Sequence, residues 1–305
     1  MSRITLLDGG MGQELIKRSP GEPTALWSAR VMMDDPELVK EVHLDYIRAG
    51  ARVITVNAYS ATRDRLEPHG FGDRFEELQR RACELALRAR DESGEEVAIA
   101  GCLPPLMWSY RPDLAGSSDQ TADIYAEIAR LQAPHVDLIL CETMSSADQG
   151  LGAVRGALEG GGGKPVWVAW TLRDDDSGRL RSGETLAEAA AALDGLPVAA
   201  RLLNCSIPEA LTAAMPELAA LGGRVGGYAN GFTGIVSDYG PGSTVKALSG
   251  RTDLAPEAYA DLAIGWVADG ATIVGGCCEI GPAHIAEIAR RLTAAGHEII
   301  GDTNG

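Results

Sequence analysis

Short apolar stretches alternate with longer amphipathic stretches along the whole chain. The apolar stretches, which read as strands, are Ile4 to Leu7, Val53 to Val56, Val97 to Ala100, Val136 to Leu140, Val166 to Leu172, Val198 to Leu203, Arg224 to Tyr228 and Thr272 to Val274. The amphipathic stretches have helical spacing and are Pro36 to Ala49, Arg74 to Asp91, Thr121 to Gln132, Ala147 to Glu159, Leu186 to Leu193, Pro208 to Leu221, Pro256 to Asp269 and Pro282 to Ala295. Alternating strands and helices imply a parallel sheet, and eight such units predict a closed α/β barrel, the (β/α)8 or TIM barrel.

No long linker or low-complexity segment interrupts this alternation, which favours a single domain over residues 1–305. In such barrels the chemistry lies at the carboxyl ends of the strands. The polar stretch from Gly231 to Leu254 follows the seventh predicted strand on that face, where long loops are usually functional. The acidic run Asp174 to Asp176 follows the fifth strand. Its spacing does not match a calcium loop, so we expect a solvated loop.

Three cysteines follow predicted strands and suggest a metal site. Cys277 and Cys278 are adjacent, and a trans peptide holds their Cα atoms about 3.8 Å apart, below the usual disulfide range. Cys205 ends another apolar run and can supply a third thiol. Zinc favours thiolates, and a catalytic zinc has three protein ligands and one open position. We therefore expect reduced thiols that bind Zn²⁺ and no disulfide framework.

Composition narrows the choice of partners and location. The 305 residues carry a formal net charge of −16, without a basic cluster, which opposes binding to nucleic acid. No apolar run is long enough to span a bilayer, and the first residues enter a strand pattern without a signal-peptide core. The sequence therefore predicts a cytoplasmic protein without a membrane partner, as a monomer or small homo-oligomer.

Several motifs together resemble the zinc-dependent homocysteine S-methyltransferases over nearly the whole chain. These motifs are Asp8-Gly-Gly-Met-Gly12, Leu26-Trp-Ser28, Val42 to Gly50 leading to Ile54-Thr-Val-Asn57, Cys141-Glu-Thr143, Asn204-Cys205 and Gly275-Gly-Cys-Cys278. The resemblance implies that Cys205, Cys277 and Cys278 bind zinc and that the homocysteine sulfur takes the fourth position. It also implies methyl transfer to homocysteine, with methionine as product.

The resemblance further assigns the amino-acid site. Asp8 and Glu142 would contact the homocysteine ammonium, which needs anionic partners when buried. Backbone amides near Gly9 and Gly10 would face the carboxylate, since close backbone approach needs glycine. Three further residues complete the predicted substrate-binding set: Trp27, Asn57 and Asn230.

The methyl donor is predicted to be a cation. Zinc with three thiolates and a bound homocysteine thiolate carries a formal charge of −2, which attracts a sulfonium or quaternary ammonium donor. Aromatic residues near the expected mouth could face it; they are Trp27, Tyr59, Trp108, Tyr110 and Trp170. S-methylmethionine, S-adenosylmethionine, a betaine and dimethylsulfoniopropionate all satisfy this requirement.

Two departures and two alternatives accompany the resemblance. Relatives usually carry a Gly-Ser-Val-Gly-Pro type run where this chain has Gly101-Cys-Leu-Pro-Pro-Leu106, and many have an apolar residue at Cys141. The first departure falls on the donor side.

One alternative function is a zinc-binding or redox-sensing barrel that uses the Cys277 and Cys278 dithiol without transferase activity. The other is a homocysteine half-site that serves a methylated corrinoid.

Overall fold

Parallel strands form one curled sheet at the centre of the molecule. The computed structural model describes residues 2–20, 24–235, 240, 243 and 247–304. In this part of the chain the strands are β1 (Arg3–Leu6), β2 (Val53–Thr55), β3 (Ala98–Leu103), β4 (Leu138–Met144), β5 (Val166–Trp170), β6 (Val198–Asn204), β7 (Val225–Tyr228), β8 (Ile273–Val274) and β9 (Glu298–Ile300). Their order is β2-β3-β4-β5-β6-β7-β8-β1-β9, and every ladder is parallel.

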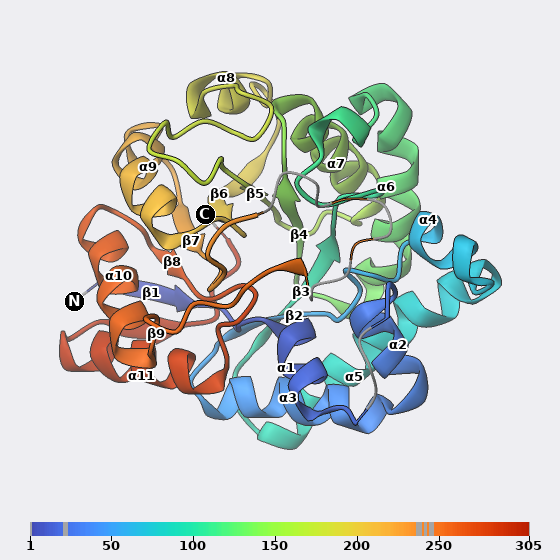
Figure 1. Cartoon of the computed structure of the whole chain (residues 1–305), viewed down its shortest axis with the longest axis horizontal. Coiled ribbons are helices and arrows are strands. Elements are labelled where there is room, and N and C mark those ends of the chain that lie inside the picture. The colour runs from blue at the N-terminus through green and yellow to red at the C-terminus, as the bar shows by residue number, and fades with distance from the viewer. Residues whose placement is uncertain (1, 21–23, 236–239, 241–242, 244–246, 305) are drawn as a thin grey trace.

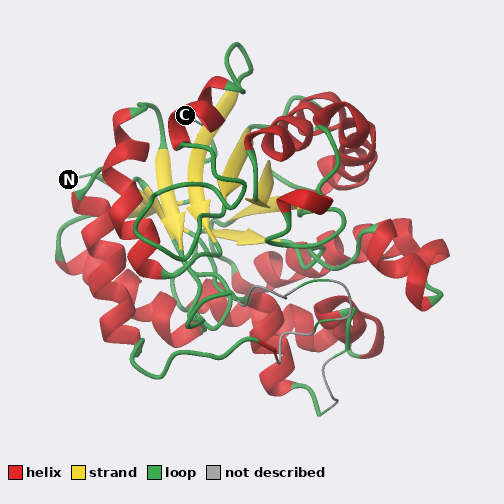
Figure 2. Cartoon of the chain, turned by 45° about the horizontal axis from the view of Figure 1, so that its top comes forward, coloured by secondary structure: helices red, strands yellow, loops and turns green. Residues whose placement is uncertain are grey.

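Helices surround this sheet, as Figure 1 shows, and Figure 2 gives the same arrangement from a tilted view. They are α1 (Met11–Arg18), α2 (Trp27–Asp34), α3 (Pro36–Arg48), α4 (Arg63–Leu66), α5 (Phe75–Ser93), α6 (Ser118–Gln132), α7 (Ala147–Gly160), α8 (Leu186–Ala191), α9 (Pro208–Ala220), α10 (Pro256–Ala268) and α11 (Pro282–Ala294). The eight predicted helices correspond to α3 and to α5 through α11. The predicted α/β barrel is confirmed.

Local sequence signals explain several helix starts. Asp35 precedes Pro36 at the first turn of α3, and its carboxylate accepts a hydrogen bond from the Leu38 amide at 3.3 Å. At α8, the Thr185 hydroxyl accepts from the Glu188 amide at 3.1 Å, while the Glu188 carboxylate accepts from the Thr185 amide at 2.7 Å. None of the helices in the described part of the chain is long and apolar enough to cross a bilayer.

The apolar core has two layers. Inside the barrel, side chains such as Leu140, Trp167 and Leu202 form one buried cluster. A larger cluster lies between the strands and the surrounding helices, with Ile54, Val168 and Leu211 among its members. Successive residues of a strand point to opposite sides, so strands buried on both sides are apolar throughout. The barrel interior is thus filled, which leaves the carboxyl ends of the strands for a binding cavity.

The seam between β1 and β2 closes the barrel in two parts. Near the carboxyl ends, the Asp8 amide donates to the Val53 carbonyl at 3.0 Å, and Leu7 bridges to Val53. Near the amino ends, β9 pairs with β1 and occupies the seam. The sequence did not predict β9, because this strand is short and at most partly buried.

The chain beyond β9 lies against the bottom of the barrel. The Trp167 indole N–H donates to the Thr303 carbonyl at 3.1 Å, and the Arg224 guanidinium donates to the carbonyls of Asp302 and Asn304 at 3.1 and 2.7 Å. Arg224 also donates to the Thr5 hydroxyl at 2.8 Å. These bonds tie the last described residues to β5 and to Arg224, which directly precedes β7 and is itself bonded to β1.

Candidate active site

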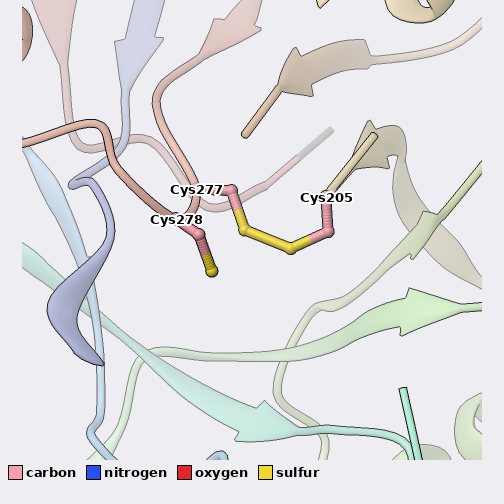
Figure 3. Close-up of side chains that lie close together, drawn as sticks. All are labelled: Cys205, Cys277 and Cys278. Carbon is pink, nitrogen blue, oxygen red and sulfur yellow. A yellow bond between two sulfur atoms is a disulfide. The ribbon is translucent and has the colours of Figure 1, made fainter. Parts of the chain in front are cut away.

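The three predicted cysteines come together at the carboxyl ends of β6 and β8 (Figure 3). The sulfur atoms of Cys205, Cys277 and Cys278 lie within 4.8 Å of one another. Tetrahedral zinc with Zn–S bonds of about 2.3 Å needs sulfur atoms about 3.8 Å apart. The three thiols are gathered closely enough to share one ion once they are reduced, so these residues fit zinc in donor chemistry and in clustering.

Backbone contacts hold these cysteines in place. The Cys277 amide donates to the Ala229 carbonyl at 2.9 Å, and the Cys278 carbonyl accepts from the Gly231 amide at 2.8 Å. Cys205 has a φ of 48°, in the left-handed region that costs energy for a residue with a Cβ. The loop after β7 therefore holds Cys277 and Cys278, while the Cys205 amide donates to the carbonyl of Tyr228, at the end of β7.

A disulfide joins Cys205 to Cys277 in this structure, with the Cα atoms 5.8 Å apart. The expectation of reduced thiols or metal ligands in place of disulfides is therefore wrong for this pair, although Cys277 and Cys278 are not bonded to each other. Two thiols that converge on one point can either share a metal ion or bond together on oxidation. Burial raises the pKa of the remaining Cys278 thiol to about 12, and Glu279 adds to the effect.

Gly9 and Gly10 allow the start of α1 to approach the cysteine loop. A Cβ on Gly9 would lie 2.1 Å from the Ile280 carbonyl oxygen, and one on Gly10 would lie 2.5 Å from the Cys277 oxygen. The Gly10 amide already donates to Ile280 at 2.9 Å. The glycines are thus explained by close packing, and the Gly10 amide is occupied where the sequence predicted that it faces the substrate carboxylate.

Two buried carboxyl groups face the same cavity. Asp8 follows β1, and its Oδ2 accepts from the Thr55 amide at 2.8 Å. Glu142 lies in β4 and accepts from the Cys102 thiol at 3.0 Å and the Tyr228 hydroxyl at 3.5 Å. Burial raises the pKa of Asp8 to about 8, with a further rise from the charge of Glu142. Burial likewise raises the pKa of Glu142 to about 7. A bound cation would favour the ionised form of both groups.

The cavity, together with the open space at its mouth, spans about 820 Å³. It is lined by both carboxyl groups, all three cysteines and Gly9, Gly10, Trp27 and Asn57, together with other residues. None of the described residues that line it is Lys, Arg or His. The electrostatics of this cavity therefore favour cationic groups on its ligands.

The two predicted asparagines are placed differently. Asn57 lines the cavity, and its amide group donates to the Ser28 carbonyl at 3.3 Å. Asn230 is fully buried and is not among the lining residues. Its Oδ1 accepts from the Phe232 amide at 3.0 Å, whereas its Nδ2 has no partner within the described chain. Asn230 thus shapes the loop between the cysteines from behind the cavity wall.

Three of the five expected aromatic residues line the cavity, namely Trp27, Tyr59 and Tyr110. The rings of Trp27 and Tyr59 meet edge to face, with centroids 6.1 Å apart. Trp108 instead lies beside the Arg65 guanidinium, at 5.8 Å, and Trp170 is fully buried in the core.

Sequence reasoning missed other lining residues, among them Tyr228, Phe232 and Leu248. Tyr228 could have been found, because it ends a predicted strand. Phe232 and Leu248 belong to the long loop predicted to be functional; residues 236–239, 241–242 and 244–246 of that loop lie outside the described chain.

Comparison with known proteins gives the family. The family model for homocysteine S-methyltransferase matches residues 5–292. Homocysteine S-methyltransferase of Escherichia coli strain K12 is 33% identical, over 94% of this chain and 95% of the relative. A selenocysteine methyltransferase of Astragalus bisulcatus is 27% identical, over 96% of this chain and 93% of the relative.

Solved structures agree with that assignment. The metallated form of the E. coli homocysteine methyltransferase MmuM superimposes with a TM-score of 0.78 at 29% identity, over 94% of this chain and 96% of the other. Its oxidized form gives a TM-score of 0.77 at 28% identity, with the same coverage. The chain therefore belongs to the homocysteine S-methyltransferase family.

Proposed function

We propose that this enzyme transfers a methyl group from a cationic donor to the thiolate of homocysteine, which yields methionine. One observation carries the proposal: three converging thiols and two buried carboxyl groups line one cavity that has no basic side chain among its described residues. The family supplies the reaction class. The metal, the donor and the residue roles are the proposal.

The cysteines and the two carboxyl groups have different roles in binding homocysteine. Cys205, Cys277 and Cys278 would hold zinc, which when bound supplies the positive charge that ionises the substrate thiol. Asp8 and Glu142 bind the homocysteine ammonium, and each loses its own proton as the ammonium arrives. They orient the amino acid and transfer no proton to the reacting sulfur. Gly9 and Gly10 bring the start of α1 to the same end of the substrate.

The donor side is the aromatic part of the cavity. The substrate sulfur forms a bond to the methyl carbon while the bond to the donor sulfur or nitrogen breaks, and that sulfur or nitrogen keeps the electron pair and becomes uncharged. Arg65 already lies 5.5 Å from the Tyr59 ring, and Arg181 lies 4.7 Å from the Tyr110 ring. Trp27 has no such resident cation within the described chain and is the ring that we assign to the donor, a contact worth about 0.5–2 kcal/mol.

The test is a donor panel with reduced, zinc-loaded protein and homocysteine. S-methylmethionine, S-adenosylmethionine, glycine betaine and dimethylsulfoniopropionate are compared, and methionine is measured. We expect turnover with at least one of them, and Trp27→Ala should raise the KM of that donor more than the KM of homocysteine. Efficient use of a neutral or anionic donor such as a methylated folate would contradict the assignment.

The metal is tested separately. Cys277→Ala with Cys278→Ala should abolish zinc binding and turnover, whereas Cys83→Ala, in the buried face of α5, is the matched control and should keep both. Full zinc content in the double variant would refute the metal site.

The disulfide favours a second candidate, a barrel that senses redox state through Cys205 and Cys277. It replaces the alternative based on Cys277 and Cys278, which are not bonded to each other. Such a sensor would bind no homocysteine, so a reduced protein without homocysteine affinity would favour it. The corrinoid alternative predicts turnover only with a methylated corrinoid. We further propose that the enzyme acts in the cytoplasm and that residues 1–305 form a single domain.

A further inference from the structure

An ion pair lies beneath the loops that surround the cavity. Arg181 donates to both carboxylate oxygens of Asp174, at 3.2 and 3.1 Å, and the two side chains are only 11% and 14% exposed. The sequence predicted a solvated loop at residues 174–176. That prediction is wrong for Asp174, because this carboxylate turns inward to meet the guanidinium. Such a pair is costly to bury unless its remaining hydrogen-bonding positions are used.

A further hydrogen bond of Arg181 connects it to Cys205 through Thr171. The Arg181 Nε donates to the Thr171 hydroxyl at 3.2 Å, and that hydroxyl donates to the Cys205 carbonyl at 3.1 Å. Thr171 is fully buried and is not among the residues that line the cavity. The route from Asp174 to the cysteine is therefore continuous, and its last step, at Thr171, is fully buried.

The same carboxylate fixes the backbone that follows the cysteine. The Ile207 amide donates to Asp174 Oδ1 at 3.3 Å, while the Ile235 amide, in the loop after β7, donates to Oδ2 at 2.9 Å. Cys205 between these contacts has the left-handed backbone noted above, which persists only where the surroundings hold it. The network is built around this strained residue.

Arg181 also supports the opposite wall of the cavity. Its guanidinium lies 4.7 Å from the centre of the Tyr110 ring, and Tyr110 lines the cavity with a left-handed backbone of its own. One guanidinium thus contacts both the chain of hydrogen bonds to Cys205 and a ring on the donor side.

We propose that Thr171, Asp174 and Arg181 are positioning residues that set the direction of the Cys205 thiol as a metal ligand. The inference rests on the proposed zinc site and deepens it. In metal sites, groups behind the ligands fix ligand orientation, and their loss typically lowers metal affinity about 10- to 100-fold. In this site the Thr171 hydroxyl contacts the backbone carbonyl of Cys205, because the cysteine side chain has no polar atom other than the sulfur that would bind the metal.

The experiment uses two substitutions at Thr171. Thr171→Val keeps the shape and removes the hydroxyl, whereas Thr171→Ser keeps the hydroxyl. We expect zinc affinity, measured on reduced protein by competition with a chelator, to fall about 10-fold or more in Thr171→Val. Thr171→Ser should restore most of it. The Co²⁺ form of Thr171→Val should also show altered thiolate-to-metal absorption, which a general loss of stability would not produce.

Arg181→Met provides a second variant should Thr171→Val fold poorly. We expect it to lower zinc affinity and also to raise the donor KM through the loss of the contact to Tyr110. The control is Arg130→Met, which breaks an exposed pair with Glu159 and should change neither quantity. Parent-like zinc affinity and Co²⁺ spectra in Thr171→Val or in Arg181→Met would overturn this inference alone. Absence of zinc binding by the parent protein would overturn the proposed metal site together with it.

Discussion

At the scale of single residues, Cys102 contacts Glu142, one of the two buried carboxyl groups of the cavity. Cys102 is fully buried at the end of β3, and its thiol donates to Glu142 Oε1 at 3.0 Å. Burial, reinforced by the charge of Glu142, raises the pKa of this thiol well above its ordinary value. It therefore keeps its proton and remains a donor throughout the neutral range.

We predict that Cys102→Ala raises the KM for homocysteine about 3- to 10-fold, as expected for one hydrogen bond worth about 0.5–1.5 kcal/mol. Cys102→Ser keeps a donor and should stay close to the parent. Zinc content should be the same in all three proteins. The measurement is steady-state kinetics with homocysteine varied at saturating donor. An unchanged KM in Cys102→Ala would mean that Tyr228 alone orients Glu142.

At the scale of elements, α3 contains a polar side chain that its packing does not satisfy. His43 is fully buried in this helix, and neither ring nitrogen has a partner within the described chain. Burial lowers the pKa of His43 to about 3 from an ordinary value of 6.5. The folded protein therefore keeps this ring neutral, whereas the unfolded chain takes up a proton below about pH 6.5. Stability is lost as the pH falls from 6.5 toward 3, by up to about 1.4 kcal/mol per pH unit.

We predict that His43→Leu raises the free energy of unfolding by about 1 kcal/mol at pH 7, because it removes two unsatisfied polar atoms. The gain should grow at pH 5. Denaturant unfolding at both pH values measures it, and His135→Leu, at an exposed position, is the control. A gain that does not change between pH 7 and pH 5 would contradict the explanation by protonation.

The elements also mark the limit of prediction from sequence. The spacing of apolar residues along the chain identified the first eight strands and the helices that follow them. The positions of the strand ends then placed Asp8, Glu142 and the cysteines at the same end of the barrel. The apolar spacing missed α1, α2, α4 and β9, which are short. It also missed the inward turn of Asp174 and the burial of Asn230 behind the wall. The inward turn of Asp174 depends on Arg181, in the same loop, and on the distant amides of Ile207 and Ile235, none of which a helical or strand period encodes.

At the scale of the whole molecule, β9 and the residues after it complete the barrel. Without them, β1 would expose unpaired backbone groups at its amino end, and the Trp167 indole and Arg224 guanidinium would lose their carbonyl partners. An exposed strand edge also promotes association between chains.

We predict that removal of residues 298 to 305 lowers the Tm by several degrees and promotes aggregation. Thermal unfolding and light scattering measure the two effects. Glu298→Ala changes a side chain that is 59% exposed and is the matched control; it should leave both unchanged. A truncated protein that remained monomeric with the parent Tm would show that the seam closes without β9.

The pairing of β9 with β1 has a consequence for biosynthesis. The ribosome makes β1 first, yet its amino-terminal half gains its neighbour only when residues 298–300 have emerged. Cys277 and Cys278 follow β8, the strand on the other side of β1, so the cysteine cluster forms only after the chain has been made through residue 278. Until then Cys205 is a thiol without its two companions. For the proposed zinc site, we therefore expect metal to be loaded only after the chain has emerged through residue 300.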